Sequence, residues 1–297
     1  MRARLILAAV ALCAAGVVPQ AMASQLVGRT ASAVRLDVNG KREALLTYHA
    51  GGRWWHVLAW GAVNARAPSL TVPQVAFRLD YAGGNGKYHR SYWKVFRNLC
   101  GPYTGPPLEW LVTACTASDG SYWALQAWPR ALPNYGVRPS RARAGRELRL
   151  SHWSGAPAVL TVRTDWAYRR FDHLYGSLVY NGKPVYGFRS TRLGNPLDGY
   201  GRLIYVDTFN SRYGRGWQRE NGFLTHRPNG VFCYGFWRHG SHPVGRGTRY
   251  RVTAVGPGVT PDVVWAGQAP GRYDRTADQR ANAEQRALFP DGQCRPN

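Results

Sequence analysis

Hydrophobic and polar residues alternate over short segments along most of the chain, and Gly, Pro, Asn and Asp separate these segments. Alternation with a period of two is typical of a β-strand that buries one face. The pattern predicts strands at residues 54–60, 75–81, 110–113, 122–128, 148–153, 159–164, 203–209, 231–237, 250–255 and 263–265. Many short strands joined by turns predict a mainly β protein, an antiparallel β-sandwich or jelly roll.

Two Asn-Gly pairs predict hairpins. Asn39-Gly40 lies between the apolar segments 33–38 and 44–48, and Asn181-Gly182 lies between 177–180 and 185–188. Asn and Gly tolerate the positive φ angles that a two-residue hairpin turn requires. We therefore expect an antiparallel pair of strands around each turn.

One short helix is predicted near the C-terminal end of the chain. Thr276, with Gln279 three residues later, has the capping-box pattern, and Pro290 ends the helical segment. The residues between them are mostly small and polar, which is typical of a surface helix.

The strands divide into two halves around a basic segment. Residues 137–149 are rich in arginine and separate an N-terminal β half, 24–136, from a C-terminal β half with the terminal helix, 150–297. This segment is either a linker between two domains or a long loop in one continuous domain.

Residues 1–23 have the features of a secretory signal peptide. Arg2 and Arg4 precede an apolar run from Leu5 to Val18, and Ala21-Met22-Ala23 fits the small-residue rule for cleavage. The run is shorter than the roughly 20 residues that span a bilayer. We expect cleavage before Ser24, secretion, and no transmembrane segment in the mature chain.

The cysteines that remain after cleavage predict disulfide bonds. An even number in an exported chain is typical of a disulfide framework, and four cysteines allow three pairings. We predict Cys100–Cys115 and Cys233–Cys294, because each of these pairs stays within one half. Their spacing matches no zinc pattern, so we expect no metal there.

Charge and composition narrow the class of protein. The chain has 39 Lys and Arg against 16 Asp and Glu, a formal net charge of +23, and its 44% of apolar residues suffice for a packed core. Such a charge attracts anionic polymers non-specifically. A high-GC genome also raises arginine content, so charge alone identifies no ligand.

Common catalytic motifs are absent from the sequence. It contains no G-x-S-x-G elbow, no H-E-x-x-H zinc helix, no Walker loop and no EF-hand loop. The sequence therefore predicts no cofactor and leaves open whether the protein is an enzyme.

The first candidate site is the segment 165–173, which combines acids, arginines, a histidine and aromatic residues after a strand. In one interpretation it is a ligand loop with a stacking ring and groups that hold hydroxyls or an anion. The residues predicted to bind are Trp166, Tyr168, Arg169, Asp172 and His173. In the other interpretation the aromatic rings fold inward, while Arg and Asp pair on the surface.

The second candidate site lies between residues 198 and 226. Asp207 follows an apolar strand, so its carboxyl group could be buried, as suits a general acid, with Glu220 as partner in a two-carboxylate glycosidase. Tyr200, Trp217 and Arg219 are the predicted ligand-binding residues nearby. The alternative is that Asp207 lies on the solvent face of its strand.

Two further groups of residues are weaker candidates for a functional site. His239 and His242 have no third ligand nearby and are typical of a turn, while Asp165 and Asp172 are an alternative carboxylate pair. Most of the 12 tryptophans are expected in the core. Exposed ones beside arginine suit saccharide rings or single-stranded nucleic acid.

Three stretches, VLAWGAVNA at 57–65, YWALQAW at 122–128 and FLTHRP at 223–228, carry a family resemblance. They resemble a family of uncharacterised secreted proteins of high-GC Gram-positive bacteria. The resemblance implies export and a shared fold, and it implies no reaction and no site residue.

Three functional hypotheses follow. We favour a secreted, disulfide-bonded β-sandwich protein that binds a cell-surface, saccharide or anionic polymer without catalysis. The alternatives are a carbohydrate-active hydrolase or lyase and an extracellular nucleic-acid binder.

Overall fold

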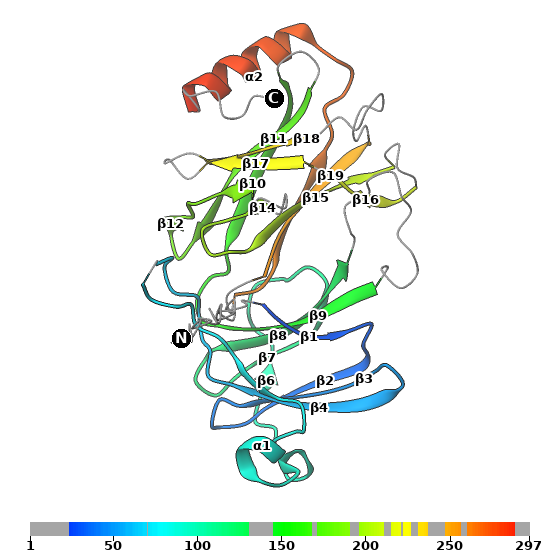
Figure 1. The fold of residues 1–297 in the computed structure, drawn as a ribbon, viewed down its shortest axis with the longest axis vertical. Helices are drawn as coiled ribbons and strands as arrows, with labels where there is room; N and C mark the ends of the chain where they lie inside the picture. Colours follow the sequence, from blue (N-terminus) through cyan, green and yellow to red (C-terminus); the bar gives the residue numbers. More distant parts are fainter. Residues whose placement is uncertain are drawn as a thin grey trace, which may run out of the picture.

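The computed structural model describes residues 24–69, 71–130, 145–167, 171–190, 196–210, 215–220, 222–226, 231–236, 247–256 and 260–288. These residues form four antiparallel sheets and a C-terminal helix (Figure 1). The predicted mainly β fold class is confirmed. No helix in this part of the chain has the length and apolar character needed to cross a membrane.

The first two sheets pack together as an N-terminal β-sandwich. One sheet has the order β1 (Gln25–Arg29), β9 (Gly145–Trp153), β8 (Tyr122–Arg130), β7 (Leu111–Thr116) and β6 (Gly101–Pro102). The other has the order β2 (Ser32–Val38), β3 (Ala44–Ala50), β4 (Arg53–Trp60) and β5 (Arg78–Asp80). Leu46, Val57, Trp123 and Leu150 belong to the core between them. The short helices α1 (Asn85–Tyr88) and η1 (Tyr92–Lys94) follow β5.

The other two sheets form a C-terminal β-sandwich with its own core. One has the order β10 (Val159–Ala167), β11 (Phe171–Tyr180), β18 (Val231–Phe236) and β17 (Gly222–His226), with β12 (Lys183–Pro184) paired to β11. The other has the order β13 (Arg189–Ser190), β14 (Pro196–Leu197), β15 (Leu203–Phe209), β19 (Arg249–Val255) and β20 (Val263–Gln268), with β16 (Trp217–Arg219) paired to β15. Leu174, Ile204, Phe232 and Val252 fill this core.

Strand β9 is the last strand of the N-terminal sandwich along the chain, and it begins inside the predicted linker. Residues 145–149, assigned from the sequence to a basic linker, form the first half of β9, which pairs with both β8 and β1. Leu148 and Leu150 are buried in the N-terminal core. The remainder of the predicted linker lies outside the described residues.

The two predicted hairpins differ in their turns. Tyr180 pairs with Lys183, and Asn181 and Gly182 have φ angles of 52° and 70°, so this is the predicted two-residue turn. Strands β2 and β3 are instead joined by residues 39–43. There the Asn39 Oδ1 atom accepts hydrogen bonds from the amides of Lys41 and Glu43 at 2.9 and 3.1 Å. The asparagine side chain therefore closes a longer loop.

The C-terminal helix α2 (Arg275–Leu288) packs against β10 at the far end of the C-terminal sandwich (Figure 1). Asp274 caps it, because its Oδ1 atom accepts hydrogen bonds from the amides of Thr276 and Ala277 at 2.7 and 3.0 Å. The cap predicted at Thr276 is therefore wrong by two residues. The negative charge of Asp274 at a helix N-terminus favours its use there.

Candidate functional site

The first predicted site is the end of a hairpin rather than a long loop. Asp165 pairs with His173 and Trp166 with Asp172 across strands β10 and β11. The indole of Trp166 is 5% exposed and meets the ring of Tyr273 edge-on at 5.8 Å. Burial raises the pKa of Asp165. Tyr168 and Arg169 lie outside the described residues.

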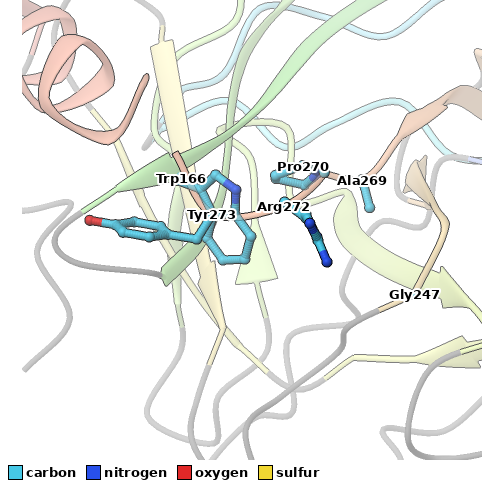
Figure 2. A pocket seen from close by; sticks show the side chains of 7 residues that line it. Trp166, Gly247, Ala269, Pro270, Arg272 and Tyr273 are labelled. Carbon is cyan, nitrogen blue, oxygen red and sulfur yellow. The ribbon is translucent and has the colours of Figure 1, made fainter. Parts of the chain in front are cut away.

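Trp166 lines a pocket of about 340 Å³ beside the segment that leads to α2 (Figure 2). Of the five residues predicted to bind in this stretch, Trp166 belongs to the lining, and the side chains of the other four lie outside the described part of the chain. The other lining residues are Gly247, Ala269, Pro270, Gly271, Arg272 and Tyr273. Segment 269–273 is about a hundred residues away from Trp166 along the chain. Sequence analysis therefore did not group the guanidinium of Arg272 and the ring of Tyr273 with Trp166.

Asp207, the predicted general acid, is an ion-pair partner of two arginines. The Nε atom of Arg219 donates to its Oδ1 at 2.6 Å, and Nε and Nη2 of Arg251 donate to its Oδ2 at 3.2 and 2.8 Å. Arg219 on β16 and Arg251 on β19 both lie directly opposite Asp207 in the register of the sheet. The side chain of Asp207 is 1% exposed, so its predicted burial is observed.

Glu220 is brought into the same buried cluster. It is 1% exposed, and its amide donates to the Val206 carbonyl at 2.9 Å. Burial raises the pKa of Tyr234, whose hydroxyl lies within the electrostatic reach of Arg219, Glu220 and Asp207. A glycosidase pair must face substrate and water. Neither carboxylate is solvent-exposed in this structure, and the catalytic pair stays a prediction.

Aromatic rings surround these arginines and join the two sandwiches. The Arg219 guanidinium lies 4.0 Å from the ring of Tyr205 on β15 and 5.3 Å from that of Trp128 on β8. The two rings are stacked at 5.5 Å. Such contacts are worth most where water is excluded. The cluster therefore acts as a structural joint between the N-terminal and C-terminal sandwiches.

The other two predicted binding residues lie in different surroundings. Trp217 is half-buried at the edge of this joint, with the guanidinium groups of Arg251 and Arg249 at 4.5 and 5.6 Å. Tyr200 contacts Tyr180 edge-on at 5.7 Å and lies under Arg202 at 5.1 Å.

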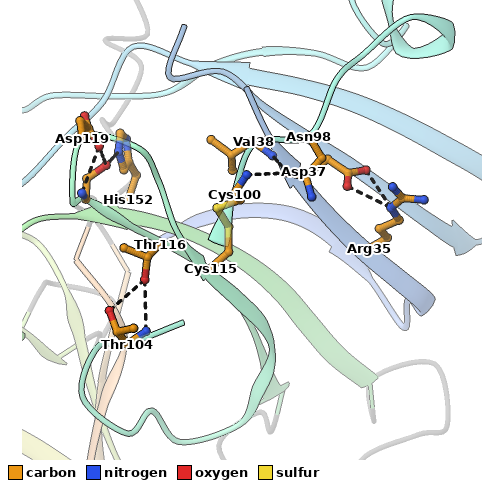
Figure 3. The surroundings of a disulfide bond; sticks show 11 residues. Arg35, Asp37, Val38, Asn98, Cys100, Thr104, Cys115, Thr116, Asp119 and His152 are labelled. Atoms are coloured by element: carbon orange, nitrogen blue, oxygen red, sulfur yellow. Dashed lines mark hydrogen bonds and ion pairs between the residues drawn. A yellow bond between two sulfur atoms is a disulfide. The ribbon is translucent and has the colours of Figure 1, made fainter. Parts of the chain in front are cut away.

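The predicted disulfide Cys100–Cys115 is present and fastens segment 98–102 to the N-terminal sandwich (Figure 3). The Oδ1 atom of Asn98 accepts hydrogen bonds from the amides of Val38 and Cys100, both at 3.0 Å. The bridge therefore links β7 of one sheet to β2 of the other. Cys233 is also disulfide-bonded. Its predicted partner, Cys294, lies outside the described residues.

Sequence analysis missed a surface on strand β4. Alternation places Trp54, His56 and Trp60 on one face of the strand. Trp54 is 57% exposed and is the one exposed tryptophan among the described residues. Tryptophan is enriched at interaction surfaces, because its ring offers a large apolar area together with a polar N–H group.

Helix η1 extends this face with a further tryptophan. The ring of Trp93 stacks on His56 with centroids 3.9 Å apart. The ammonium group of Lys94 lies 5.6 Å from the Trp93 ring, and that of Lys87 lies 4.6 Å from the Trp60 ring. We call Trp54, His56, Trp60 and Trp93, with Lys87 and Lys94, the β4 aromatic face.

The surroundings of the β4 aromatic face are basic. Segment 78–97 contains five Lys and Arg residues and a single acid, Asp80. Both oxygens of Asp80 are engaged by backbone amides, those of Ala82 and Gly86 at 2.8 and 2.7 Å. On the neighbouring hairpin end, the guanidinium of Arg53 covers the ring of Trp55 at 3.6 Å. Lys87 forms an ion pair with the buried carboxylate of Glu43. The exposed positive charge of this segment therefore comes from Arg78, Arg90, Lys94 and Arg97.

Comparisons of the chain with family models, curated proteins and solved structures found no match. The resemblance to a family of uncharacterised secreted proteins of high-GC Gram-positive bacteria therefore stays a prediction. No group of three or more His, Cys, Asp or Glu residues that could hold a metal is found in the described ranges. His239 and His242 lie outside those ranges.

Proposed function

We propose that this chain is a secreted protein that binds an anionic polysaccharide on the β4 aromatic face, without catalysis. The observation that carries the proposal is the exposed indole of Trp54, in line with the stacked His56–Trp93 pair. The apolar face of a sugar ring packs on an indole, and the polar edge of the sugar stays hydrated.

The positive charge around the face favours an anionic polymer over a neutral one. Lys94 and the arginines of segment 78–97 are exposed on the same sandwich. Charges of one sign concentrate oppositely charged ligands, and salt weakens this attraction.

The test is a binding measurement with the mature protein against alginate, an anionic polysaccharide, and dextran, a neutral one, at low and high salt. We expect binding to alginate that weakens with salt and at least tenfold weaker binding by Trp54→Ala. Tyr186→Ala is the matched control, because Tyr186 is 47% exposed but lies on the C-terminal sandwich. Its affinity should equal that of the unmodified protein.

Two results would overturn the proposal. One is unchanged alginate affinity in Trp54→Ala. The other is tighter binding of single-stranded DNA that depends on Trp54, which would assign the face to nucleic acid. Lys94→Gln should lower the salt dependence while leaving the thermal unfolding temperature unchanged.

A further inference from the structure

A buried carboxylate lies against the residue that begins the predicted mature chain. Asp262 is 3% exposed, and its Oδ1 atom accepts hydrogen bonds from the Ser24 hydroxyl at 2.6 Å and the Gly256 amide at 3.3 Å. Its Oδ2 atom is buried and has no hydrogen-bond partner among the described residues. A buried carboxylate oxygen without a donor is costly, so this atom is suited to a further cation or donor.

The cations near Asp262 are engaged elsewhere. Arg149 and Arg202 both favour the ionised form of Asp262, but burial has the larger effect and raises its pKa. The Arg149 guanidinium donates to Glu147 at 2.7 Å and to the Ser24 carbonyl at 3.1 Å, while Arg202 donates to Asp198 at 2.7 Å. Neither arginine therefore supplies the missing donor to Asp262.

Cleavage of the signal peptide would create such a donor. Hydrolysis of the peptide bond between Ala23 and Ser24 by an endopeptidase consumes one water molecule and leaves a carboxylate on Ala23 and an amine on Ser24. The amine takes up a proton at neutral pH, because the pKa of an α-amino group is about 8. The α-nitrogen is three bonds from the Ser24 hydroxyl oxygen, which lies 2.6 Å from the Asp262 carboxylate. Standard bond lengths therefore place the new charge within roughly 6 Å of that carboxylate.

We propose that removal of the signal peptide before Ser24 generates an α-ammonium group that forms a buried ion pair with Asp262. This inference concerns maturation of the chain and is independent of the proposed ligand. Ser24 precedes β1 of the N-terminal sandwich, and Asp262 precedes β20 of the C-terminal one.

The ion pair would act at the contact between the two sandwiches. Gln126 of β8 accepts a hydrogen bond from the Asp262 amide at 2.9 Å and donates to the Asp262 carbonyl at 3.1 Å. The hydroxyl of Ser151 on β9 donates to the Thr260 carbonyl at 3.3 Å. Cleavage thus adds a charge pair to an existing set of interdomain hydrogen bonds, and it stabilises the mature form over its precursor.

The experiment compares two otherwise identical chains, one beginning at Ser24 and one with a single alanine added before it. We expect the chain beginning at Ser24 to have an unfolding equilibrium constant at least 30-fold smaller at pH 6. An ion pair raises the pKa of the ammonium in the folded state above its unfolded value of about 8. The advantage is therefore complete below pH 8 and is lost above it, as the pH rises through the raised folded-state pKa. Equal stability at pH 6 would overturn the proposal.

A second set of variants identifies the partner carboxylate. In Asp262→Asn the difference between the two chains should disappear, while in Asp37→Asn it should persist, because Asp37 is a buried acid that pairs with Arg35 instead. If Asp262→Asn does not fold, the proposal is tested instead by the rate at which a succinimidyl ester acylates the α-amine. We expect it to be at least tenfold slower in the folded chain beginning at Ser24 than in its alanine-extended form, and equal rates would overturn the proposal.

Discussion

The indole of Trp93 lies face to face with the imidazole of His56, with the ring planes only 3° apart. Gly83 makes this contact possible. A Cβ atom at Gly83 would lie 2.6 Å from the Cδ1 atom of Trp93, and the φ angle of Gly83 is +68°. The stacked pair attaches helix η1 to strand β4 and so sets the position of the β4 aromatic face.

Gly83→Ala should therefore displace Trp93. The positive φ angle alone costs about 1 kcal/mol for alanine, and the clash adds roughly 1–3 kcal/mol. The matched control is Gly52→Ala, because Gly52 has a φ of +77° and no atom within 4 Å of the added Cβ. Urea unfolding should show a larger loss of stability for Gly83→Ala, and equal losses would contradict the steric role of Trp93.

Acid should destabilise the protein through His152. Its Nδ1 atom donates to the Ala62 carbonyl at 2.5 Å, its Nε2 atom contacts the Ser121 hydroxyl at 2.9 Å, and its ring stacks on Trp123. Burial lowers the pKa of His152 to about 4. Figure 3 shows this residue beside Asp119.

The sign of the pH effect follows from proton binding. Between about pH 6.5 and pH 4 the unfolded chain carries a proton on His152 that the folded chain lacks, so stability falls as the pH falls, by about 3 kcal/mol in total. We expect urea unfolding at several pH values to show this loss. In His152→Asn the loss should shrink by that amount, and in His49→Asn it should remain. An unchanged pH dependence in His152→Asn would contradict the assignment.

Local patterns predicted much of this fold, because period-two alternation depends only on neighbouring residues. The strand around Asp207 and the burial of its carboxylate could both be inferred from Leu203 to Val206. The two arginines that bind Asp207 could not, because they lie on other strands and pair with it only through sheet register. Likewise, alternation groups Trp54 with His56, but it does not reveal that η1 covers His56 and leaves Trp54 in solvent.

Reduction of the Cys100–Cys115 bond should destabilise the N-terminal sandwich. The bridge closes a loop with a sequence separation of 15 residues, for which loss of the constraint on the unfolded chain costs about 3 kcal/mol. The double variant Cys100→Ser, Cys115→Ser should therefore unfold at a lower urea concentration. Its affinity for alginate should be unchanged if the β4 aromatic face keeps its shape.

The ion pairs of Asp207 should be structural. Removing one partner of a buried ion pair leaves an uncompensated charge and typically costs 3–5 kcal/mol. The side chain of Arg219 is 1% exposed, and Asp207 keeps Arg251 as a partner when Arg219 is replaced. Arg219→Met should therefore lose part of that amount, roughly 2 kcal/mol. Arg249→Gln is the control, since Arg249 is exposed at the edge of the same joint and should change stability by less than about 1 kcal/mol.

A substitution of Asp207 itself distinguishes a structural role from a role as catalytic acid. In Asp207→Asn, two guanidinium groups lose their shared carboxylate, so stability should fall while polysaccharide binding per folded molecule stays the same. A catalytic acid would behave in the opposite way, because its loss abolishes turnover and often leaves stability unchanged or improved. We expect calorimetry to show a lower unfolding temperature for Asp207→Asn. A fully stable variant that had lost a measurable glycan-cleaving activity would contradict the structural role.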